Sequence, residues 1–202
     1  RYGLMEQMTR ELARSSRYRE EVDAWSIVNN AFSTSFAGFD ASKSLCSTSH
    51  VGLDGTTRAN RPSVDIGLSV TAIQGMVTRF RRMTNQRGLP MNMAPAMLVI
   101  APEQLFTARE VLGSSGAPYK TDNEINSVVP EGLRYFSTPY KTSTTSWLAL
   151  AKKGEHDLNF MYRDRPMFDS WDDPTTKNAV FSVYQRHTQG YGSYFGVDGS
   201  AG

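Results

Sequence analysis

The fold of this chain is decided by the stretch Gly88-Leu-Pro-Met-Asn-Met-Ala-Pro-Ala-Met-Leu-Val-Ile-Ala-Pro102. Its apolar run, residues 97–100, predicts a short buried strand. Pro102 suits the first position of a helix, because that position needs no backbone N–H donor. Apolar residues recur at helical spacing over residues 105–112, and Gly113 ends the helix. The stretch supplies architecture and no group that can do chemistry.

Size and composition describe an ordinary folded protein. The 202 residues, 39% of them hydrophobic, can fill one large core or two small ones. The net charge of +2 makes neither nucleic acid nor an anionic membrane an obvious partner. The single cysteine excludes an intramolecular disulfide and suits a reducing compartment. No apolar run approaches the roughly 20 residues that span a bilayer, so we expect a soluble protein without a membrane partner.

Two helices are predicted in the first half of the chain. The first covers residues 4–32, which is about 45 Å at ~1.5 Å per residue. A helix of that length either lies across a sheet with a wet outer face or contacts a neighbouring molecule. The second helix begins after Ser69, a good N-cap, and ends before Gly88. The apolar stripe of the first helix consists of Tyr18, Val22, Trp25, Val28 and Phe32.

The second half of the chain alternates loops and strands. Residues 114–130 form a polar excursion longer than most connections, and loops of that length usually have a role in contact. Strands are predicted over residues 133–140, 147–151, 157–163 and 179–187, the last two from apolar and polar residues in alternation. The whole pattern indicates an α+β protein.

Cys46 and His50 are the only close thiol and imidazole pair. A thiolate nucleophile needs such a base within hydrogen-bond reach, so the pair is the basis of an enzyme alternative. No helix N-terminus and no orienting carboxylate is evident nearby, and a structural or incidental role is favoured. We therefore predict no catalytic residues.

Other chemical sites are not indicated by the spacing of the residues. The three histidines fit no zinc pattern, and the acidic residues between 164 and 173 lack the spacing of a calcium loop, so neither a metal nor a cofactor is expected. A basic group could bind phosphate as a nucleic-acid-binding module, but it lacks an aromatic platform and sits where cations neutralise a helix end. This group consists of Arg79, Arg81, Arg82 and Arg87.

Several short segments, in this order, resemble the major capsid proteins of tailed bacteriophages. The likeness covers nearly the whole chain and is closest to the Mu-like prophage major head subunit branch of the Hong Kong 97-type fold. No single segment is diagnostic. The segments are Asn29-Asn-Ala-Phe32, Ser44-Leu-Cys-Ser-Thr-Ser-His50, residues 88–102, Asn123-Glu-Ile-Asn126, Ser146-Trp-Leu148, Arg163-Asp-Arg-Pro166 and Gly190-Tyr-Gly-Ser-Tyr-Phe-Gly196.

The resemblance implies a particular domain organisation. Residues 1–60 would form a peripheral domain with a long spine helix, residues 61–153 an axial domain, and residues 154–202 the return to the peripheral domain sheet. The family's N-terminal arm and extended loop normally precede the spine helix, and this chain begins inside that helix. Cross-links or maturation cleavage placed in those parts therefore cannot be carried over.

The resemblance also implies a structural function and its partners. The chain would be the head subunit that self-assembles into the icosahedral shell of a virion, built in the bacterial host cytoplasm. Its partners would be copies of itself in pentamers and hexamers, with scaffold, portal and cement proteins and nonspecific contact with packaged DNA.

Two sets of residues are candidates for contacts between subunits. The first lies in the polar excursion, which by the likeness points toward a five-fold or six-fold axis: Asp122, Glu124 and Asn126. The second carries opposite charges at a density that suits salt-sensitive pairs at an interface rim. It consists of Arg163, Asp164, Arg165, Asp169 and Asp172.

Overall fold

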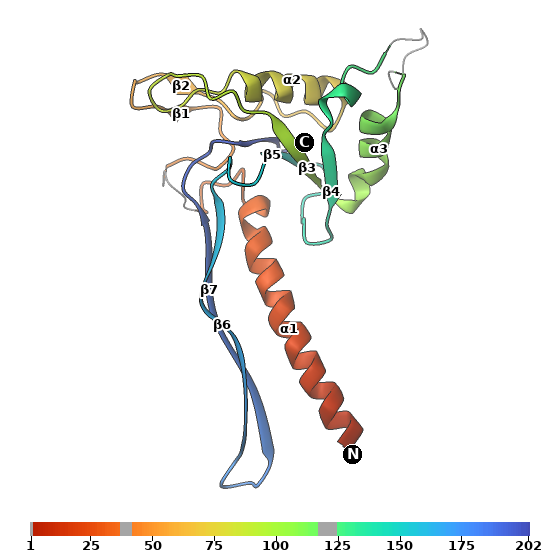
Figure 1. Cartoon of the computed structure of the whole chain (residues 1–202), viewed down its shortest axis with the longest axis vertical. Helices are drawn as coiled ribbons and strands as arrows, with labels where there is room; N and C mark the ends of the chain where they lie inside the picture. Colours follow the sequence, from red (N-terminus) through yellow and green to blue (C-terminus); the bar gives the residue numbers. More distant parts are fainter. Residues whose placement is uncertain (1, 37–41, 117–124) are drawn as a thin grey trace. The chain divides into compact units, whose positions relative to one another are not determined.

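The computed structural model describes residues 2–36, 42–116 and 125–202 (Figure 1). Helices and strands both contribute, which confirms the prediction of a mixed α+β fold. The elements are α1 (Tyr2–Asn29), β1 (His50–Val51), β2 (Thr57–Arg58), α2 (Val70–Arg81), β3 (Pro95–Ile100), the 3-10 helix η1 (Pro102–Gln104), α3 (Leu105–Gly113), the 3-10 helix η2 (Val129–Glu131), β4 (Arg134–Ser137), β5 (Trp147–Ala151), β6 (Leu158–Asp172), β7 (Ala179–Tyr191) and β8 (Val197–Ser200).

The chain divides into two compact units. Unit 1 consists of Arg1–Ile27 and Asn159–Gly190, and unit 2 consists of Val28–Leu158 and Tyr191–Gly202. This division does not coincide with the domain boundaries expected near residues 60 and 153. The assignment to peripheral and axial domains remains a prediction.

Unit 1 is a helix and a long two-stranded ribbon. β6 and β7 pair with each other and with no other strand of the described residues. A two-stranded ribbon is marginally stable alone in water, so it needs a packing partner. The part of α1 that belongs to unit 1 is this packing partner. The Ser16 hydroxyl donates a hydrogen bond to Gln185 Oε1 at 3.0 Å, and His187 Nε2 lies 2.9 Å from Asp23 Oδ2.

The apolar stripe predicted for the first helix does not form the face that contacts the ribbon. Tyr18 is 62% exposed and Val22 is 36% exposed. Ser16 and Asp23, seven residues apart, instead face β7 through hydrogen bonds. α1 is thus held to the ribbon by polar contacts, and much of its apolar surface in unit 1 stays in water.

Unit 2 is built on a four-stranded sheet of order β4-β3-β5-β8. β3 runs parallel to β4 and antiparallel to β5, and β5 runs antiparallel to β8. The core combines this sheet with α2 and α3. Its largest fully buried side chains include Phe80 from α2, Leu98 and Ile100 from β3, and Trp147 from β5.

The strand and helix predicted from residues 88–102 are confirmed as β3, η1 and α3. Pro102 stands at the start of η1, and α3 ends at Gly113. The predicted N-cap of α2 is also confirmed, because the Ser69 hydroxyl accepts a hydrogen bond from the Ala72 backbone N–H at 3.2 Å. The start and end of each of these elements are set by residues close to one another along the chain.

Asn60 organises the loops of unit 2, a role that the sequence analysis did not find. Its side chain is fully buried. Its amide nitrogen donates to the carbonyl oxygens of Leu45 and Val197, and its amide oxygen accepts from the Ser47 backbone N–H and lies 3.0 Å from His50 Nε2. One amide therefore joins the segment before β1 to the last strand.

Candidate functional site

The charged residues proposed for subunit contacts on β6 are accessible. Arg163, Arg165, Asp169 and Asp172 are exposed, and Asp164 is half-buried. All lie on one strand of 15 residues and form a charged row about 30 Å long at ~3.3 Å per residue. Because successive side chains of a strand point to opposite faces, Asp164 and Asp172 lie on the face opposite to the other three. The structure places this set at the surface of unit 1, where a neighbouring molecule could reach it.

Large apolar side chains stand among these charges. On β6 and β7 seven of them are more than two-fifths exposed, which is unusual for one small element of a soluble protein. We call them the ribbon apolar set: Met161, Tyr162, Met167, Phe168, Trp171, Phe181 and Tyr184. Their mixture with charges is typical of a contact surface, since interfaces concentrate aromatic, methionine and arginine side chains.

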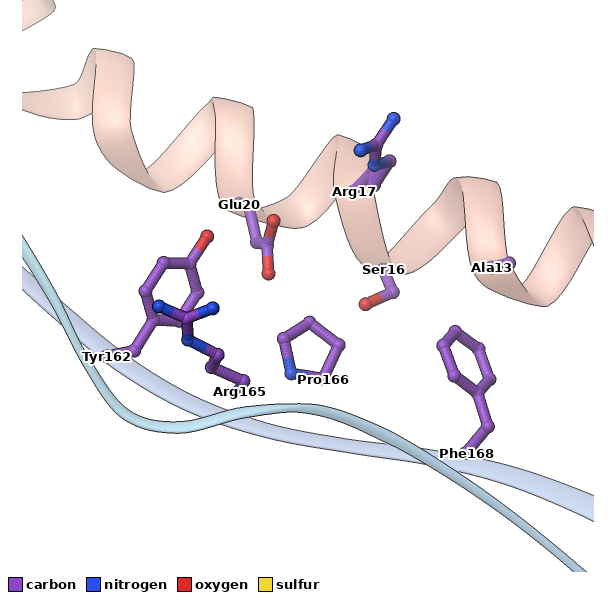
Figure 2. A pocket seen from close by; sticks show the side chains of 8 residues that line it. All are labelled: Ala13, Ser16, Arg17, Glu20, Tyr162, Arg165, Pro166 and Phe168. Carbon is purple, nitrogen blue, oxygen red and sulfur yellow. The ribbon is translucent and has the colours of Figure 1, made fainter.

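A groove of about 370 Å³ lies within unit 1 between α1 and β6 (Figure 2). Figure 2 shows Glu20 of α1 pointing toward β6, with Tyr162, Arg165 and Pro166 opposite it. Phe168 lies at one end of the groove, opposite Ala13. Sequence reasoning missed Glu20 and Tyr162; the helical spacing of Ser16, Glu20 and Asp23 was the available signal.

The groove holds a carboxylate with unused capacity. One oxygen of Glu20, Oε1, is buried and has no hydrogen-bond partner among the described residues. Partial burial, followed by the negative charge of Glu20, raises the pKa of the Tyr162 hydroxyl. The groove therefore offers a buried hydrogen-bond acceptor that no described residue occupies.

The polar excursion is described only at its ends. Asp122 and Glu124 lie outside the described residues. Asn126 is buried, and its amide nitrogen donates to the carbonyl oxygens of Val111 and Ser114 while its oxygen accepts from the Val128 backbone N–H. Asn126 thus anchors the loop to α3, and its proposed part in subunit contacts remains a prediction.

Cys46 and His50 do not have the environment of a catalytic pair. Cys46 is fully buried, and burial, followed by the charge of Asp198, raises the pKa of its thiol well above the ordinary value. His50 Nε2 is engaged with Asn60, and its ring stacks on Tyr194 with centroids 3.9 Å apart. The thiolate needed for nucleophilic attack is strongly disfavoured at this position.

The basic group at the end of α2 is largely paired. Arg79 forms a two-pronged ion pair with the buried Asp198, with both N···O distances 2.7 Å. Arg81 pairs with Glu131 at 2.8 Å. Arg82 and Arg87 are exposed. Half of the group therefore serves the fold of unit 2.

Two further classes of site are absent from residues 2–36, 42–116 and 125–202. No three His, Cys, Asp or Glu side chains there come close enough together to hold a metal ion. No described helix has the length and hydropathy needed to cross a membrane.

A family model described as a phage capsid protein matches residues 1–197, which is nearly the whole chain and includes both compact units. No curated protein matches the chain significantly.

Proposed function

This chain belongs to a phage capsid protein family, and from that premise we propose that it is the major head subunit that self-assembles into the icosahedral shell enclosing phage DNA. The observation that carries the proposal is the extent of the family match, residues 1–197. Exposed apolar and charged side chains on the ribbon support it, because a subunit that tiles must present such surfaces to its neighbours.

The finer assignment is to the Hong Kong 97-type fold and its Mu-like branch. The 28-residue helix α1 suits the spine helix of that fold. Three strands of the four-stranded sheet, β3, β4 and β5, lie inside the segment expected to be axial, while the fourth strand, β8, comes from the segment expected to return to the peripheral domain. Residues 1–60 and 154–202 would then be peripheral and residues 61–153 axial. Proteolysis of assembled particles would test these boundaries, since peripheral and axial loops differ in accessibility.

Subunit contacts would be made by the charged row on β6 and by the polar excursion, the two sets predicted from the sequence. Each exposed ion pair contributes about 1 kcal/mol or less, so such contacts act collectively. The ribbon apolar set adds area that a neighbour would remove from water. The row on β6 would supply orientation and salt sensitivity, while the apolar side chains would supply most of the free energy.

The partners that follow are copies of the chain in pentamers and hexamers, together with scaffold, portal and cement proteins and nonspecific contact with packaged DNA. The place of action would be the virion, after assembly in the host cytoplasm. A Cys46-dependent enzyme is the weaker alternative, because burial raises the pKa of that thiol.

Electron microscopy of the purified full chain, at rising concentration, tests the proposal. Shells, capsomers or ordered fragments of a shell are the expected result, because weak contacts between subunits multiply in a closed array. A matched preparation with Trp171→Asp places a charge in the ribbon apolar set and should lower the yield of particles while the chain stays folded. Preparations that remain strictly monomeric at high concentration would contradict the proposal.

A further inference from the structure

A second pocket lies in unit 2, where the end of α2 meets the segment that precedes β8. Its volume is about 230 Å³. Its polar lining comes from Arg58, Thr78, Arg79, Arg82, Thr84 and Tyr194, so three guanidinium groups surround one small space. None of these residues belongs to the surfaces described above for subunit contacts.

The charges around this pocket do not cancel. Arg58 is paired with Asp54, and Arg79 is paired with Asp198. Arg82, the C-cap residue of α2, has no ion pair among the described residues. The lining and its paired acids therefore carry one positive charge more than negative charges, and that charge sits on an exposed side chain that can move toward a ligand.

Tyr194 supplies an unused hydrogen-bond donor in the same pocket. The residue is 6% exposed, and its hydroxyl is buried without a hydrogen-bond partner among the described residues. Its ring is held by stacking on His50, with centroids 3.9 Å apart and ring planes 2° apart. Buried hydroxyl groups are rarely left unsatisfied, so this one calls for a partner that the described residues do not provide.

Thr84 supplies a second donor. Its hydroxyl oxygen accepts a hydrogen bond from Arg58 Nε at 2.6 Å. Because a hydroxyl accepts and donates at once, the Thr84 proton remains available to an acceptor in the pocket. Together with Arg82 and Tyr194, the pocket presents three donors from two segments of the chain, the end of α2 and the segment before β8.

We propose that this pocket binds an oxyanion of the phosphate class, either free phosphate or a phosphate of a nucleic-acid backbone. Donors that line the pocket from two segments suit the tetrahedral distribution of oxygens in phosphate, whereas the planar carboxylates are already matched to Arg58 and Arg79 as two-pronged pairs. The carbonyl end of α2 opposes an anion, and the uncompensated Arg82 together with the two neutral donors outweighs that weaker partial charge. This inference does not depend on the proposed capsid function.

Calorimetric titration of the purified full chain with inorganic phosphate tests the site. Arg82→Gln should weaken phosphate binding by about tenfold or more, because hydrogen bonds to a charged group are among the strong ones. Arg87→Gln is the matched control, since it removes an exposed arginine of the same basic group that does not line the pocket. This control should leave the affinity within about twofold of the original value, the ordinary scale of a screened surface charge.

Tyr194→Phe separates binding from folding. It keeps the ring that stacks on His50 and removes only a hydroxyl with no hydrogen bond to lose, so the urea midpoint of the phosphate-free protein should not fall. Phosphate binding should still weaken several-fold. A variant that loses stability without phosphate and binds phosphate normally would overturn the assignment of Tyr194 to the site.

The source of the phosphate is settled by a competition experiment with a short DNA duplex at fixed salt. The nucleic-acid backbone is supported as the source if inorganic phosphate displaces the duplex and if Arg82→Gln weakens the binding of both the duplex and inorganic phosphate. Binding of inorganic phosphate alone supports free phosphate. The proposal is overturned if phosphate does not bind, if acetate competes as well as phosphate, or if Arg87→Gln weakens binding as much as Arg82→Gln.

Discussion

Asp198 shows how a single buried charge can define the chemistry of a region. Its carboxylate is fully buried in β8 and accepts two hydrogen bonds from Arg79. Burial nevertheless raises the pKa of this carboxyl to about 6, because the loss of hydration outweighs the stabilising effect of the arginine. The ion pair joins α2 to the edge strand β8 of the sheet. In the folded protein the Asp198 carboxyl is nevertheless protonated more easily than in the unfolded chain.

The pH dependence of unfolding should report Asp198 directly. Because the folded pKa lies above the ordinary value of 3.8, the contribution of this group to stability is fully present below about pH 4 and is lost as the pH rises through 6. Relative to Asp198→Asn, the wild type should lose up to about 3 kcal/mol between pH 4 and pH 7. Urea unfolding of both proteins across that range measures the difference. If the wild type instead gains stability relative to Asp198→Asn as the pH rises, the ion pair with Arg79 outweighs the effect of burial on the Asp198 carboxylate.

Cys46 should behave as a core residue. Burial raises the pKa of its thiol, and its backbone N–H donates to the Ala31 carbonyl oxygen at 2.7 Å, which holds the segment inside unit 2. We expect reaction with a thiol reagent at pH 8 to be at least about a hundredfold slower than in urea, because access requires opening of the structure. The absorbance of the released chromophore measures both rates. A fast reaction in the native protein would revive the enzyme alternative.

At the scale of elements, the sheet of unit 2 depends on close approach between its strands. Gly199 in β8 pairs with Leu148 in β5. A Cβ atom at Gly199 would lie 2.7 Å from the Leu148 Cδ1 atom and 2.8 Å from the Trp147 carbonyl oxygen, both inside van der Waals contact. This position therefore requires a residue without a side chain.

Gly199→Ala should destabilise the protein by about 1–3 kcal/mol, the usual range for overpacking a filled core. Gly67→Ala is the matched control, because a Cβ atom there would meet no atom within 4 Å and the backbone is not left-handed. Chemical unfolding gives both free energies. Equal stability of the two variants would show that β8 can shift away from β5, and would remove the argument for a rigid edge.

At this scale, the elements that could be predicted from the sequence are those whose limits are set by residues close together along the chain. β3, η1 and α3 were predictable because Pro102 and Gly113 mark their limits within a few residues of the apolar positions. The pairing of β8 with β5 was not, because Val197–Ser200 carries a short, glycine-containing sequence whose partner lies about fifty residues away. The same reason explains why Asn60 and the phosphate-class pocket were missed: their contacts combine residues that only the fold brings together.

For the candidate contact surface, the sequence proposes residues whose role in subunit contacts stays a prediction. The charges of β6 were found because they are dense along one segment. The groove that Glu20 shares with Tyr162 required knowledge of which face of α1 meets the ribbon, and apolar periodicity indicated a different face. A helix that presents apolar side chains to solvent misleads a pattern argument, since such arguments assume that apolar residues face the chain's own core.

On the scale of the whole molecule, a capsid subunit must fold alone and still keep surfaces for others. The core of unit 2 satisfies the first requirement with a continuous set of buried side chains from α2, α3 and the sheet. The ribbon of unit 1 is the surface that we propose for the second, because its strands expose aromatic and methionine side chains beside charges. Loss of one exposed contact should therefore affect assembly without unfolding the chain.

Charge reversal on the ribbon tests that separation. Arg163 is exposed on β6, and no described residue is recorded as its ion-pair partner, so Arg163→Glu should leave the free energy of unfolding within about 0.5 kcal/mol of the wild type. Assembly should weaken most at low ionic strength, where an unfavourable charge at a subunit rim is least screened, and should recover as salt approaches about 1 M. Arg87→Glu makes the same change on an exposed residue of unit 2 outside the ribbon and is the control. Sedimentation of both variants and the wild type at several salt concentrations measures the assembled fraction. If Arg163→Glu and Arg87→Glu assemble alike at every ionic strength, the charged row of β6 is not a contact between subunits, and the interface must be sought on other surfaces of the chain.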